Sequence, residues 1–495
     1  MRYREFLQQR YKRILRCTGM TLSIIGVVIV SPILCLPFCE DDTVMSWGFI
    51  CPGVLVAGIG WTLSRLCADS EPMDITYREG VVVIVLSWTM AVLFGAVPFM
   101  LNTELNFAQA FFEATSGWTT TGLSVVDVTA VPYCILLYRS VLQFVGGAGF
   151  AIIMLSALAG PAGTALTTGE GREGQLAPNI KKSAKLVLSM YVGYAVMGTL
   201  GLRAVGMDWF DAINHAFTAV STGGFSTRAE SIGYWNSPAV EGVTVGLMLL
   251  GSTNFVTAHM LLKRQFRFLW RNGELRLQLA LLLFFLPILF LGVTNRLYPV
   301  LHKGLRVTIF EAVSGLSTTG FSTVSYESWG AVGWLVLLVL MLIGGGTGST
   351  AGGLKQFRIY VLYRGLLWEF KRRILPQNVV TETYVWHGEQ RRFITDEDLR
   401  HAGLFMFLYV VVFVLGAMVI SSYGYPLKES LFEFASTVGT VGLSAGITGP
   451  ETPPVILWSQ MAGMLLGRLE FFTIILGTIK LVQDLLAMSA LRGSE

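Results

Sequence analysis

The chain has 495 residues, of which 53% are hydrophobic and 14% are charged. With a mean hydropathy of +0.60, it holds more apolar surface than an ordinary soluble fold can bury, which indicates a polytopic membrane protein. The formal net charge of +4 comes from dispersed basic residues without a groove-reading motif, so the composition argues against a nucleic-acid partner.

Long apolar segments follow one another along the chain. A helix needs about 20 residues to cross the hydrocarbon core of a bilayer, and ten segments are long enough. They lie at 17–37, 47–67, 79–101, 132–159, 186–205, 239–262, 277–295, 331–362, 402–423 and 454–489. The sequence therefore predicts ten spanning helices.

Basic residues set the predicted orientation, because Lys and Arg collect in cytoplasmic loops. The runs Arg2–Arg16, Lys263–Arg276 and Lys355–Arg400 all fall on one side of the predicted spans. The loops on the other side hold few basic residues. Both termini are therefore expected in the cytoplasm.

Four apolar stretches are too short to cross the membrane, but each can enter it and return. They are Phe107–Gly122, Phe210–Gly224, Thr308–Gly320 and Ser430–Gly442. Aligned on one glycine, their cores read Thr120-Thr121-Gly122-Leu123-Ser124, Thr222-Gly223-Gly224-Phe225-Ser226, Thr318-Thr319-Gly320-Phe321-Ser322 and Thr440-Val441-Gly442-Leu443-Ser444. Nine residues before each glycine stand Glu113, His215, Glu311 and Glu433. Such internal repetition predicts four copies of one structural unit.

The expected fold is an all-α polytopic membrane protein. Four helix–pore-loop–helix repeats with pseudo-fourfold symmetry would surround one ion path, beside an N-terminal pair of helices. The predicted boundaries are 1–75 for the N-terminal transmembrane pair and 76–165, 166–270, 271–375 and 376–495 for repeats 1 to 4. The alternative is that Thr, Ser and Gly only let helices pack closely, but four loops that share three fixed positions disfavour it.

The composition of the four loops suits a cation filter. Non-helical backbone at membrane depth must be buried or line a wet path, and rings of backbone carbonyls can replace the hydration shell of a cation. Glycine lets the backbone turn its carbonyls inward, since it reaches positive φ without a side chain. The predicted filter residues are Thr120, Thr121, Gly122, Thr222, Gly223, Gly224, Thr318, Thr319, Gly320, Thr440, Val441 and Gly442.

The acids that precede three of the glycines have two possible roles. Glu113, Glu311 and Glu433 could accept hydrogen bonds from free backbone donors of their own loops, or attract the cation directly. We favour support of the loops. Arg139, in the next apolar segment, is expected to meet an acid or a loop carbonyl.

A glycine-rich run interrupts the apolar segment 331–362 and disfavours a continuous helix. We expect a broken helix that serves as a hinged gate below the filter; a kinked helix that packs closely is the alternative. The predicted gate residues are Gly344, Gly345, Gly346, Gly348, Ser349, Thr350, Gly352, Gly353, Lys355 and Arg468.

Arg468 is a charge inside the apolar segment 454–489, where such a residue usually faces a cavity or a partner. It would act as a positive barrier below the filter, or pair with Glu470 or with an acid of another repeat. Asn254 and His259, which follow the second loop, are expected to serve in packing.

With these motifs, the chain resembles the Trk/Ktr/HKT superfamily of potassium transporters, and specifically its Trk-type bacterial membrane subunits, which include TrkH-like and TrkG-like proteins. The resemblance runs from about residue 75 to the end. Besides the four loops, three motifs carry it, namely Arg139–Gly149, Gly344–Lys355 and Gly467–Glu470. The two N-terminal segments are similar to the additional helix pair of the Trk type.

The resemblance implies potassium uptake across the bacterial cytoplasmic (inner) membrane, with K⁺ as the transported ion and no organic cofactor on this chain. It further implies a homodimer with one pore per subunit, surrounded by membrane lipid, and a cytosolic nucleotide-binding regulatory subunit of the TrkA-like kind. In this family a serine at the first filter glycine is associated with sodium permeation, so Gly122 favours potassium. One departure, Ala177-Pro-Asn-Ile180 where many relatives carry Pro-Arg-Ile, concerns regulatory contacts.

Two other classes of function fit less well. A secondary transporter of an organic solute would need discontinuous helices in inverted halves, whereas these repeats are four and alike. An enzyme would need converging acid, base or nucleophile groups, and the only clustered polar groups are hydroxyls beside glycines. We therefore expect no enzymatic activity, and leave open whether the flux is channel-like or coupled to Na⁺ or H⁺.

Overall fold

The computed structural model describes residues 2–38, 46–68, 76–148, 180–265, 270–376, 381–387 and 390–492. These residues are helical except for loops and one two-stranded sheet. The predicted boundary between repeats 1 and 2 at 165/166, the end of the segment 132–159, and Ala177–Asn179 all lie outside the described residues.

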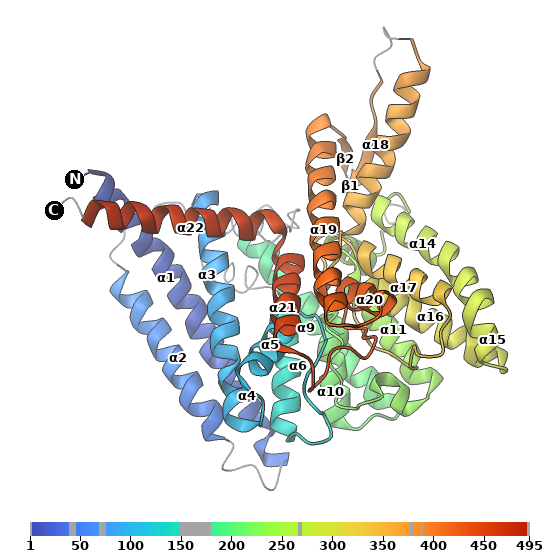
Figure 1. Ribbon diagram of the computed structural model, residues 1–495, viewed down its shortest axis with the longest axis horizontal. Helices are drawn as coiled ribbons and strands as arrows, with labels where there is room; N and C mark the ends of the chain where they lie inside the picture. The colour runs from blue at the N-terminus through green and yellow to red at the C-terminus, as the bar shows by residue number, and fades with distance from the viewer. Residues whose placement is uncertain are drawn as a thin grey trace.

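The N-terminal pair consists of α1 (Arg2–Val30), followed by η1 (Ser31–Phe38), and α2 (Trp47–Leu66). Their backbones touch, because β-carbons built on Gly26 or Gly60 would collide with the backbone of the other helix. Close approach through small residues is the usual way in which helices associate in a bilayer. The pair lies side by side at one edge of the molecule (Figure 1).

The remaining elements recur in one order: a first helix, a short re-entrant helix, a loop and a second helix. Repeat 1 contains α3 (Tyr77–Gly95), α4 (Val97–Asn102), α5 (Phe107–Trp118) and α6 (Tyr133–Ala148). Repeat 2 contains α9 (Ile180–Ala204), α10 (Trp209–Val220), η2 (Ser231–Trp235), α11 (Pro238–Ser252) and α12 (Phe255–Leu262).

Repeats 3 and 4 follow the same order with additions. Repeat 3 contains α14 (Gly273–Leu289), η3 (Phe290–Thr294), α15 (Asn295–Leu297), α16 (Leu301–Ser317), α17 (Ala331–Ile343) and α18 (Gln356–Ile374). Repeat 4 contains β1 (Tyr384–His387), β2 (Gln390–Phe393), α19 (Asp396–Ser422), α20 (Leu427–Val438), α21 (Pro454–Leu469) and α22 (Phe471–Arg492).

Seven helices of the described residues are long and apolar enough to cross a membrane, or eight if a bent pair counts as one span. Six of them coincide with predicted spans. These spans are 17–37, 47–67, 79–101, 186–205, 277–295 and 402–423. The fold is therefore the predicted all-α polytopic type.

Two of the predicted continuous helices were wrong. The segment 239–262 is divided into α11 and α12, which meet at 118°. The side chain of Asn254 accepts a hydrogen bond from the Val256 N–H and so starts a new helix at the break. The segment 454–489 ends as α21 at Leu469, since Glu470 has a φ of 64° that no right-handed helix allows.

The helix that follows this second break, α22, runs across the ends of α1 and α3 instead of alongside them (Figure 1). Its buried Asp484 lies 2.7 Å from Lys480 on α22 and 3.4 Å from Arg10 on α1. Gly477 touches the α3 backbone closely, because a β-carbon there would lie 2.9 Å from the carbonyl oxygen of Val81. The helix is therefore fixed in this transverse position by an ion cluster and by close packing.

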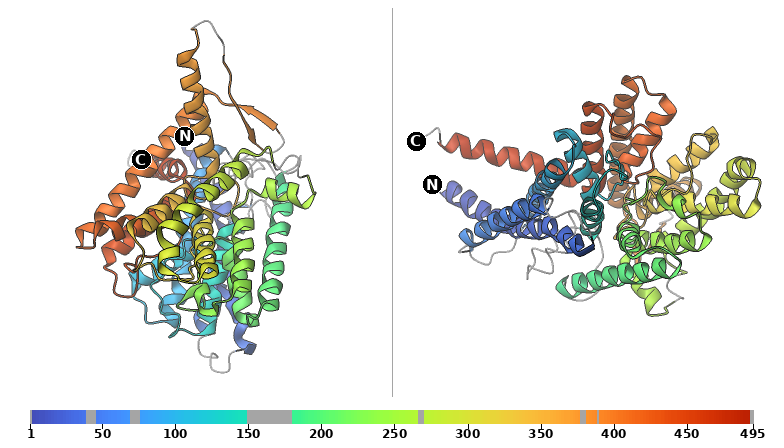
Figure 2. Two further views of the ribbon diagram at one scale, coloured as in Figure 1. Left: turned by 90° about the vertical axis from the view of Figure 1, so that its right-hand side faces the viewer. Right: turned by 90° about the horizontal axis from the view of Figure 1, so that it is seen from below.

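A short hairpin was not foreseen in the charged stretch before α19. Its strands β1 and β2 pair antiparallel, with Tyr384 opposite Phe393. The Arg391 guanidinium stacks on Tyr384, 4.0 Å from the ring centre. The end of α18 projects from the helical body near the hairpin, on the same side of the molecule as both termini (Figures 1 and 2).

The apolar cores lie between neighbouring repeats. One core joins Leu337 and Met341 of repeat 3 to Val441 and Leu443 of repeat 4. A second core joins Met248 of repeat 2 to Phe310 and Phe321 of repeat 3, and a third joins Met464 of repeat 4 to Leu123 of repeat 1. Each loop is thus held by the second helix of the repeat before it.

Candidate functional site

The four re-entrant helices end just before the aligned loops. The first two, α5 and α10, begin at side-chain caps, since Asn106 accepts from Gln109 N–H and Asp208 accepts from Asp211 N–H. The third, α16, begins at Leu301, seven residues before the predicted start at Thr308. Its first turns contain both polar and apolar residues, so the apolar stretch in the sequence began later than the helix does. Loops 1 to 4 are the segments that follow α5, α10, α16 and α20.

The loops share an uncommon backbone conformation. The threonine two residues before each aligned glycine is left-handed, with φ values of 55°, 52°, 55° and 49° at Thr120, Thr222, Thr318 and Thr440. The glycines follow with φ of 91°, 75°, 85° and 101°. For a β-branched residue this conformation costs on the order of 1–3 kcal/mol. Strain repeated at four equivalent positions indicates a functional backbone.

The four glycines form a closed ring, here called the glycine ring: Gly122, Gly224, Gly320 and Gly442. A β-carbon on each would collide with the carbonyl oxygen of the residue just before the glycine of the next loop. The contacts run from Gly122 to Gly223, from Gly224 to Thr319, from Gly320 to Val441 and from Gly442 to Thr121. Loop 4 thus returns to loop 1. The predicted filter residues are brought together around one axis, and a side chain at any glycine of the ring would have to displace the backbone of the next loop.

One face of the ring opens into a cavity of 660 Å³, here called the vestibule. Its wall includes all four glycines of the ring and charged residues of both signs. The charged residues are Asp127, Arg139, Arg228, Glu327, Lys428 and Glu429. The hydroxyl and N–H of Thr129 donate to Asp127 and lower the pKa of its carboxyl group, so this rim position keeps its negative charge.

Each predicted acid supports its own loop. Glu113 accepts from the Ser124 hydroxyl (3.0 Å) and from Val125 N–H (3.1 Å). Glu311 accepts from the N–H and hydroxyl of Thr323, and Glu433 from the Ser444 hydroxyl and Ala445 N–H. All three side chains are fully buried. These contacts are those of loop support, the favoured alternative.

Repeat 2 achieves the same support with other residues. His215, in place of the acid, contacts the Asp211 carbonyl (2.8 Å) and the Ser226 hydroxyl (2.9 Å). Asp211, one helical turn earlier, accepts from the Thr227 hydroxyl and from the Arg228 guanidinium. The carboxylate is therefore shifted by one turn and binds side chains, not the backbone, of the segment that leaves the ring.

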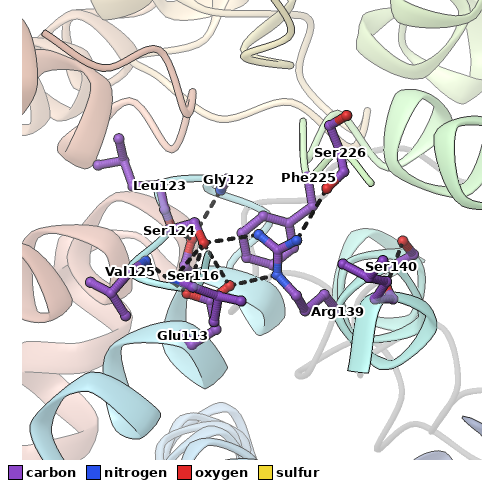
Figure 3. A network of polar contacts seen from close by, with 12 residues as sticks. Glu113, Ser116, Gly122, Leu123, Ser124, Val125, Arg139, Ser140, Phe225 and Ser226 are labelled. Atoms are coloured by element: carbon purple, nitrogen blue, oxygen red, sulfur yellow. Dashed lines mark hydrogen bonds and ion pairs between the residues drawn. The ribbon is translucent and has the colours of Figure 1, made fainter. Parts of the chain in front are cut away.

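Arg139 joins loop 1 to loop 2 (Figure 3). The side chain is 2% exposed; its Nε lies 2.7 Å from Glu113, and Nη2 donates to the Ser124 hydroxyl at 2.9 Å. The other terminal nitrogen donates to the Ser226 carbonyl at 3.1 Å, and the guanidinium stacks 4.0 Å from the centre of the Phe225 ring. Arg139 was expected to meet an acid or a loop carbonyl, and it meets both.

The opposite face of the ring is covered by the glycine-rich loop, Gly344–Lys355, which separates α17 from α18. Gly352 N–H donates to the Thr318 hydroxyl at 2.8 Å, and the Thr222 hydroxyl donates to the Thr350 hydroxyl at 3.2 Å. Within the described part of the chain, the buried hydroxyls of Thr120 and Thr440 have no hydrogen-bond partner. The glycine-rich loop therefore lies directly against the left-handed threonines.

The break between α11 and α12 holds the glycine-rich loop from the side. Gly346 N–H donates to the Ser252 carbonyl at 2.9 Å, and the Thr350 hydroxyl to the Gly251 carbonyl at 2.8 Å. Phe255 N–H donates back to the Gly348 carbonyl. Asn254, expected only to pack, starts α12 at this contact.

Glu274, at the start of α14, also binds the glycine-rich loop and was missed in the sequence. Its Oε1 accepts from Thr347 N–H at 2.7 Å, and its other oxygen from Asn254 at 3.4 Å. The side chain is 6% exposed. Asn272 caps the helix just before it, so a signal existed: an acid that directly follows a helix cap at the start of an apolar segment.

Arg468 binds the glycine-rich loop as well. Its guanidinium donates to the Thr350 carbonyl at 2.5 Å and to the Gly146 and Gly147 carbonyls at 2.9 and 3.3 Å. Glu470, one of the acids considered as an alternative partner for Arg468, binds Arg358 through both carboxylate oxygens at 2.7 Å. Arg468 thus connects repeats 1, 3 and 4 below the ring.

Apolar spanning helices around a closed ring of re-entrant loops define a polytopic membrane transport protein. The family described as "TrkH: Cation transport protein" matches residues 56–487, and the chain belongs to this family. It is a family of transporters and not of enzymes. The resemblance to Trk-type membrane subunits is thereby confirmed.

Individual relatives match along most of their length. The Trk system potassium uptake protein TrkH of Halomonas elongata is 31% identical, over 94% of this chain and 97% of the relative. The protein of the same name from Escherichia coli K12 is 32% identical, over 82% and 86%. The crystal structure of the potassium transporter TrkH from Vibrio parahaemolyticus superposes with a TM-score of 0.82 at 26% identity, over 94% of this chain and 98% of that one.

Proposed function

We propose that this protein takes up potassium through the glycine ring, with the twelve predicted loop residues as its selectivity filter. The observation that carries the proposal is the closed contact of four glycines, each against the backbone of the next loop. Four strained backbones around one axis present carbonyl oxygens to a cation that has lost its water. Relatives named as potassium uptake proteins support K⁺ as the transported ion. The proposal needs no organic cofactor.

The glycine-rich loop is the proposed gate. It covers the face of the ring opposite the vestibule, and its hydrogen bonds to the threonines of the filter would prevent an ion from leaving. Arg468 would hold this gate through the Thr350 carbonyl and add positive charge below the filter. Conduction then requires that the loop moves away from the threonines.

The proposed orientation puts the vestibule outside and both termini, α18 and the hairpin in the cytoplasm, at the bacterial inner membrane. This agrees with the basic runs near Lys355–Arg400. A cytosolic nucleotide-binding regulatory subunit would dock on this side and pull on α18, which continues directly from the gate. We further propose that the protein forms a homodimer in the lipid bilayer. The repeats keep the boundaries predicted from the sequence.

Rubidium uptake by the purified protein in liposomes tests the proposal. We expect uptake without any organic solute, with K⁺ a stronger competitor than Na⁺. Gly122→Ser should reduce the preference for K⁺, because the added side chain meets the Gly223 carbonyl of the next loop. Transport that depends on an organic solute, or equal competition by Na⁺ and K⁺ in the wild type, would contradict the proposal.

A further inference from the structure

The second helices of the four repeats can be aligned by how they touch the re-entrant helices. β-Carbons on Gly146, Gly251 and Gly467 would each collide with, or lie tightly against, the carbonyl oxygen four residues before the ring glycine of the same repeat. In repeat 3 a β-carbon on Gly315 would meet Leu337, Leu340 and Met341, and the sequence Leu340-Met341-Leu342-Ile343-Gly344 matches Leu247-Met248-Leu249-Leu250-Gly251 of repeat 2. Gly344 is therefore the fourth equivalent residue.

Three residues before these glycines, one repeat differs from the others. Repeats 2, 3 and 4 have a fully buried or nearly buried methionine there: Met248, Met341 and Met464. Repeat 1 has Gln143, which is also fully buried. A buried amide in place of three methionines requires hydrogen-bond partners.

The next loop differs at the matching place. The residue just before the ring glycine is Thr319, Val441 and Thr121 in the loops that follow the three methionines, and Gly223 in the loop that follows Gln143. Shared cores unite Met341 with Val441 and Leu443, Met248 with Phe321, and Met464 with Leu123. The equivalent positions are thus occupied by methionine and a β-branched residue at three junctions between repeats, with Met341 and Val441 in one core, and by glutamine and glycine at the fourth.

The glutamine and the glycine require each other. The amide nitrogen of Gln143 donates to the Gly223 carbonyl at 2.7 Å, and its oxygen accepts from Phe225 N–H at 3.1 Å. A β-carbon on Gly223 would collide with this same amide oxygen. The two bonds therefore bracket Gly224, a glycine of the ring, and leave no room for a side chain before it.

We propose that Gln143 is a positioning residue that holds the filter strand of loop 2 and thereby sets the selectivity for K⁺ over Na⁺; this rests on the proposed function. Loop 2 carries two consecutive glycines, Gly223 and Gly224, and so has the greatest backbone freedom of the four strands. The amide of Gln143 removes that freedom. Without it, the strand can close around the smaller Na⁺, so that the cavity no longer favours K⁺.

The test uses a combination of residues that the chain already has at the three other junctions, a methionine with a β-branched residue before the ring glycine. We compare the wild type with Gln143→Met, Gly223→Thr and the double variant in liposomes, and measure the K⁺/Na⁺ permeability ratio from the reversal potential. Gln143→Met should still conduct but with a ratio about five- to tenfold lower, as expected from the loss of two hydrogen bonds. Gly223→Thr should abolish flux, because its side chain meets the amide of Gln143.

The double variant decides between positioning and general packing. It replaces glutamine and glycine by the methionine and threonine found at two other contacts, so we expect flux to return and the ratio to recover toward the wild type. Met341→Leu, a matched change without a hydrogen bond to lose, should leave the ratio unchanged. An unchanged ratio in Gln143→Met, or a double variant as unselective as Gln143→Met, would overturn the proposal.

Two further outcomes are informative. If Gln143→Met does not fold, the double variant alone carries the test: wild-type selectivity supports the proposal, and loss of folding or of selectivity overturns it. A wild type without preference for K⁺ contradicts the proposed function as a whole, whereas a selective wild type with an equally selective Gln143→Met contradicts only the role of Gln143.

Discussion

The two faces of the glycine ring are held in different ways. On the vestibule face, three buried acids and the Arg139–Glu113 ion pair fix the backbone that leaves the ring. On the other face, hydrogen bonds between hydroxyls and backbone groups hold the glycine-rich loop, with Glu274 and Arg468 as its charged contacts. A buried charge pair is costly to break, whereas a neutral hydrogen bond contributes about 0.5–1.5 kcal/mol.

This difference matches the roles that we propose for the two faces. A filter must keep its dimensions while ions pass, and a gate must leave its place at a modest cost. The buried ion pair and acids of the vestibule face can be lost only with the fold. The hydrogen bonds of the glycine-rich loop can be replaced by hydrogen bonds to water. Variants that remove a single contact on one face or the other test this comparison.

The largest effect is expected at the buried ion pair. Arg139→Met leaves Glu113 without its countercharge and should lower the free energy of unfolding by about 3–5 kcal/mol, with loss of uptake. Thermal melting in detergent measures the change. Arg373→Gln, which removes an exposed pair with Glu369, is the control and should change stability by less than about 0.5 kcal/mol.

A double variant separates the charge from the shape of this pair. Arg139→Met with Glu113→Gln removes both charges, so we expect much of the lost stability to return. If the double variant melts no higher than Arg139→Met, packing on Phe225 is the main contribution of Arg139 and the contrast between the two faces is weaker than we infer.

The next largest effect is expected at Arg468. Arg468→Ala removes the bond from a charged group to the Thr350 carbonyl of the gate, worth about 1.5–3 kcal/mol, together with the contacts to the Gly146 and Gly147 carbonyls of repeat 1. The gate should open without the regulatory subunit, and rubidium uptake should rise by about tenfold or more. The reversal potential should stay the same, because the filter is untouched. Zero uptake by a well-expressed variant would show that Arg468 is needed for assembly.

A smaller change of the same sign is expected at Glu274. Glu274→Ala leaves Thr347 N–H without its acceptor, so uptake without the regulatory subunit should rise by up to about tenfold, the equivalent of one hydrogen bond. Glu274→Gln keeps an oxygen at the same place and should have less effect. Equal uptake by Glu274→Ala and the wild type would mean that Arg468 and the α11–α12 break hold the gate by themselves.

The sequence was sufficient for the features that repeat. Threonine, glycine and serine recur at fixed positions in four loops, and the glycine-rich run 344–353 breaks its helix by composition alone. The other features depend on contacts between residues that are far apart in the chain, and the sequence does not show these contacts. The break at Asn254 lies in an uninterrupted apolar segment, and it is stabilised by contacts with the glycine-rich loop almost a hundred residues later.

Glu274 was missed in the sequence, and Gln143 stood in the motif Arg139–Gly149 without a role, for the same physical reason. Glu274 binds Thr347, 73 residues away, and Gln143 binds Gly223, 80 residues away. The local sequence shows the partner of neither side chain, so only the contacts in the structure reveal what they do. The sequence indicates the role of Gln143 only through Gly223, since the three other loops carry a larger residue at the equivalent position.

The smallest effect is expected at an exposed charge on the vestibule rim. Asp127→Asn should lower uptake by about twofold at low ionic strength, since charges around a vestibule raise the local cation concentration. Hydrogen bonds from Thr129 lower the pKa of Asp127, so the wild type keeps this charge in mildly acidic solution, and the difference should be as large at about pH 5 as at neutral pH. The difference should vanish near 1 M salt, where screening acts within about 3 Å. Glu397→Gln, at the start of α19, is the control and should leave uptake unchanged. A loss of uptake in Asp127→Asn that persists at high salt would give Asp127 a structural role and extend the rigid support of the vestibule face to its rim.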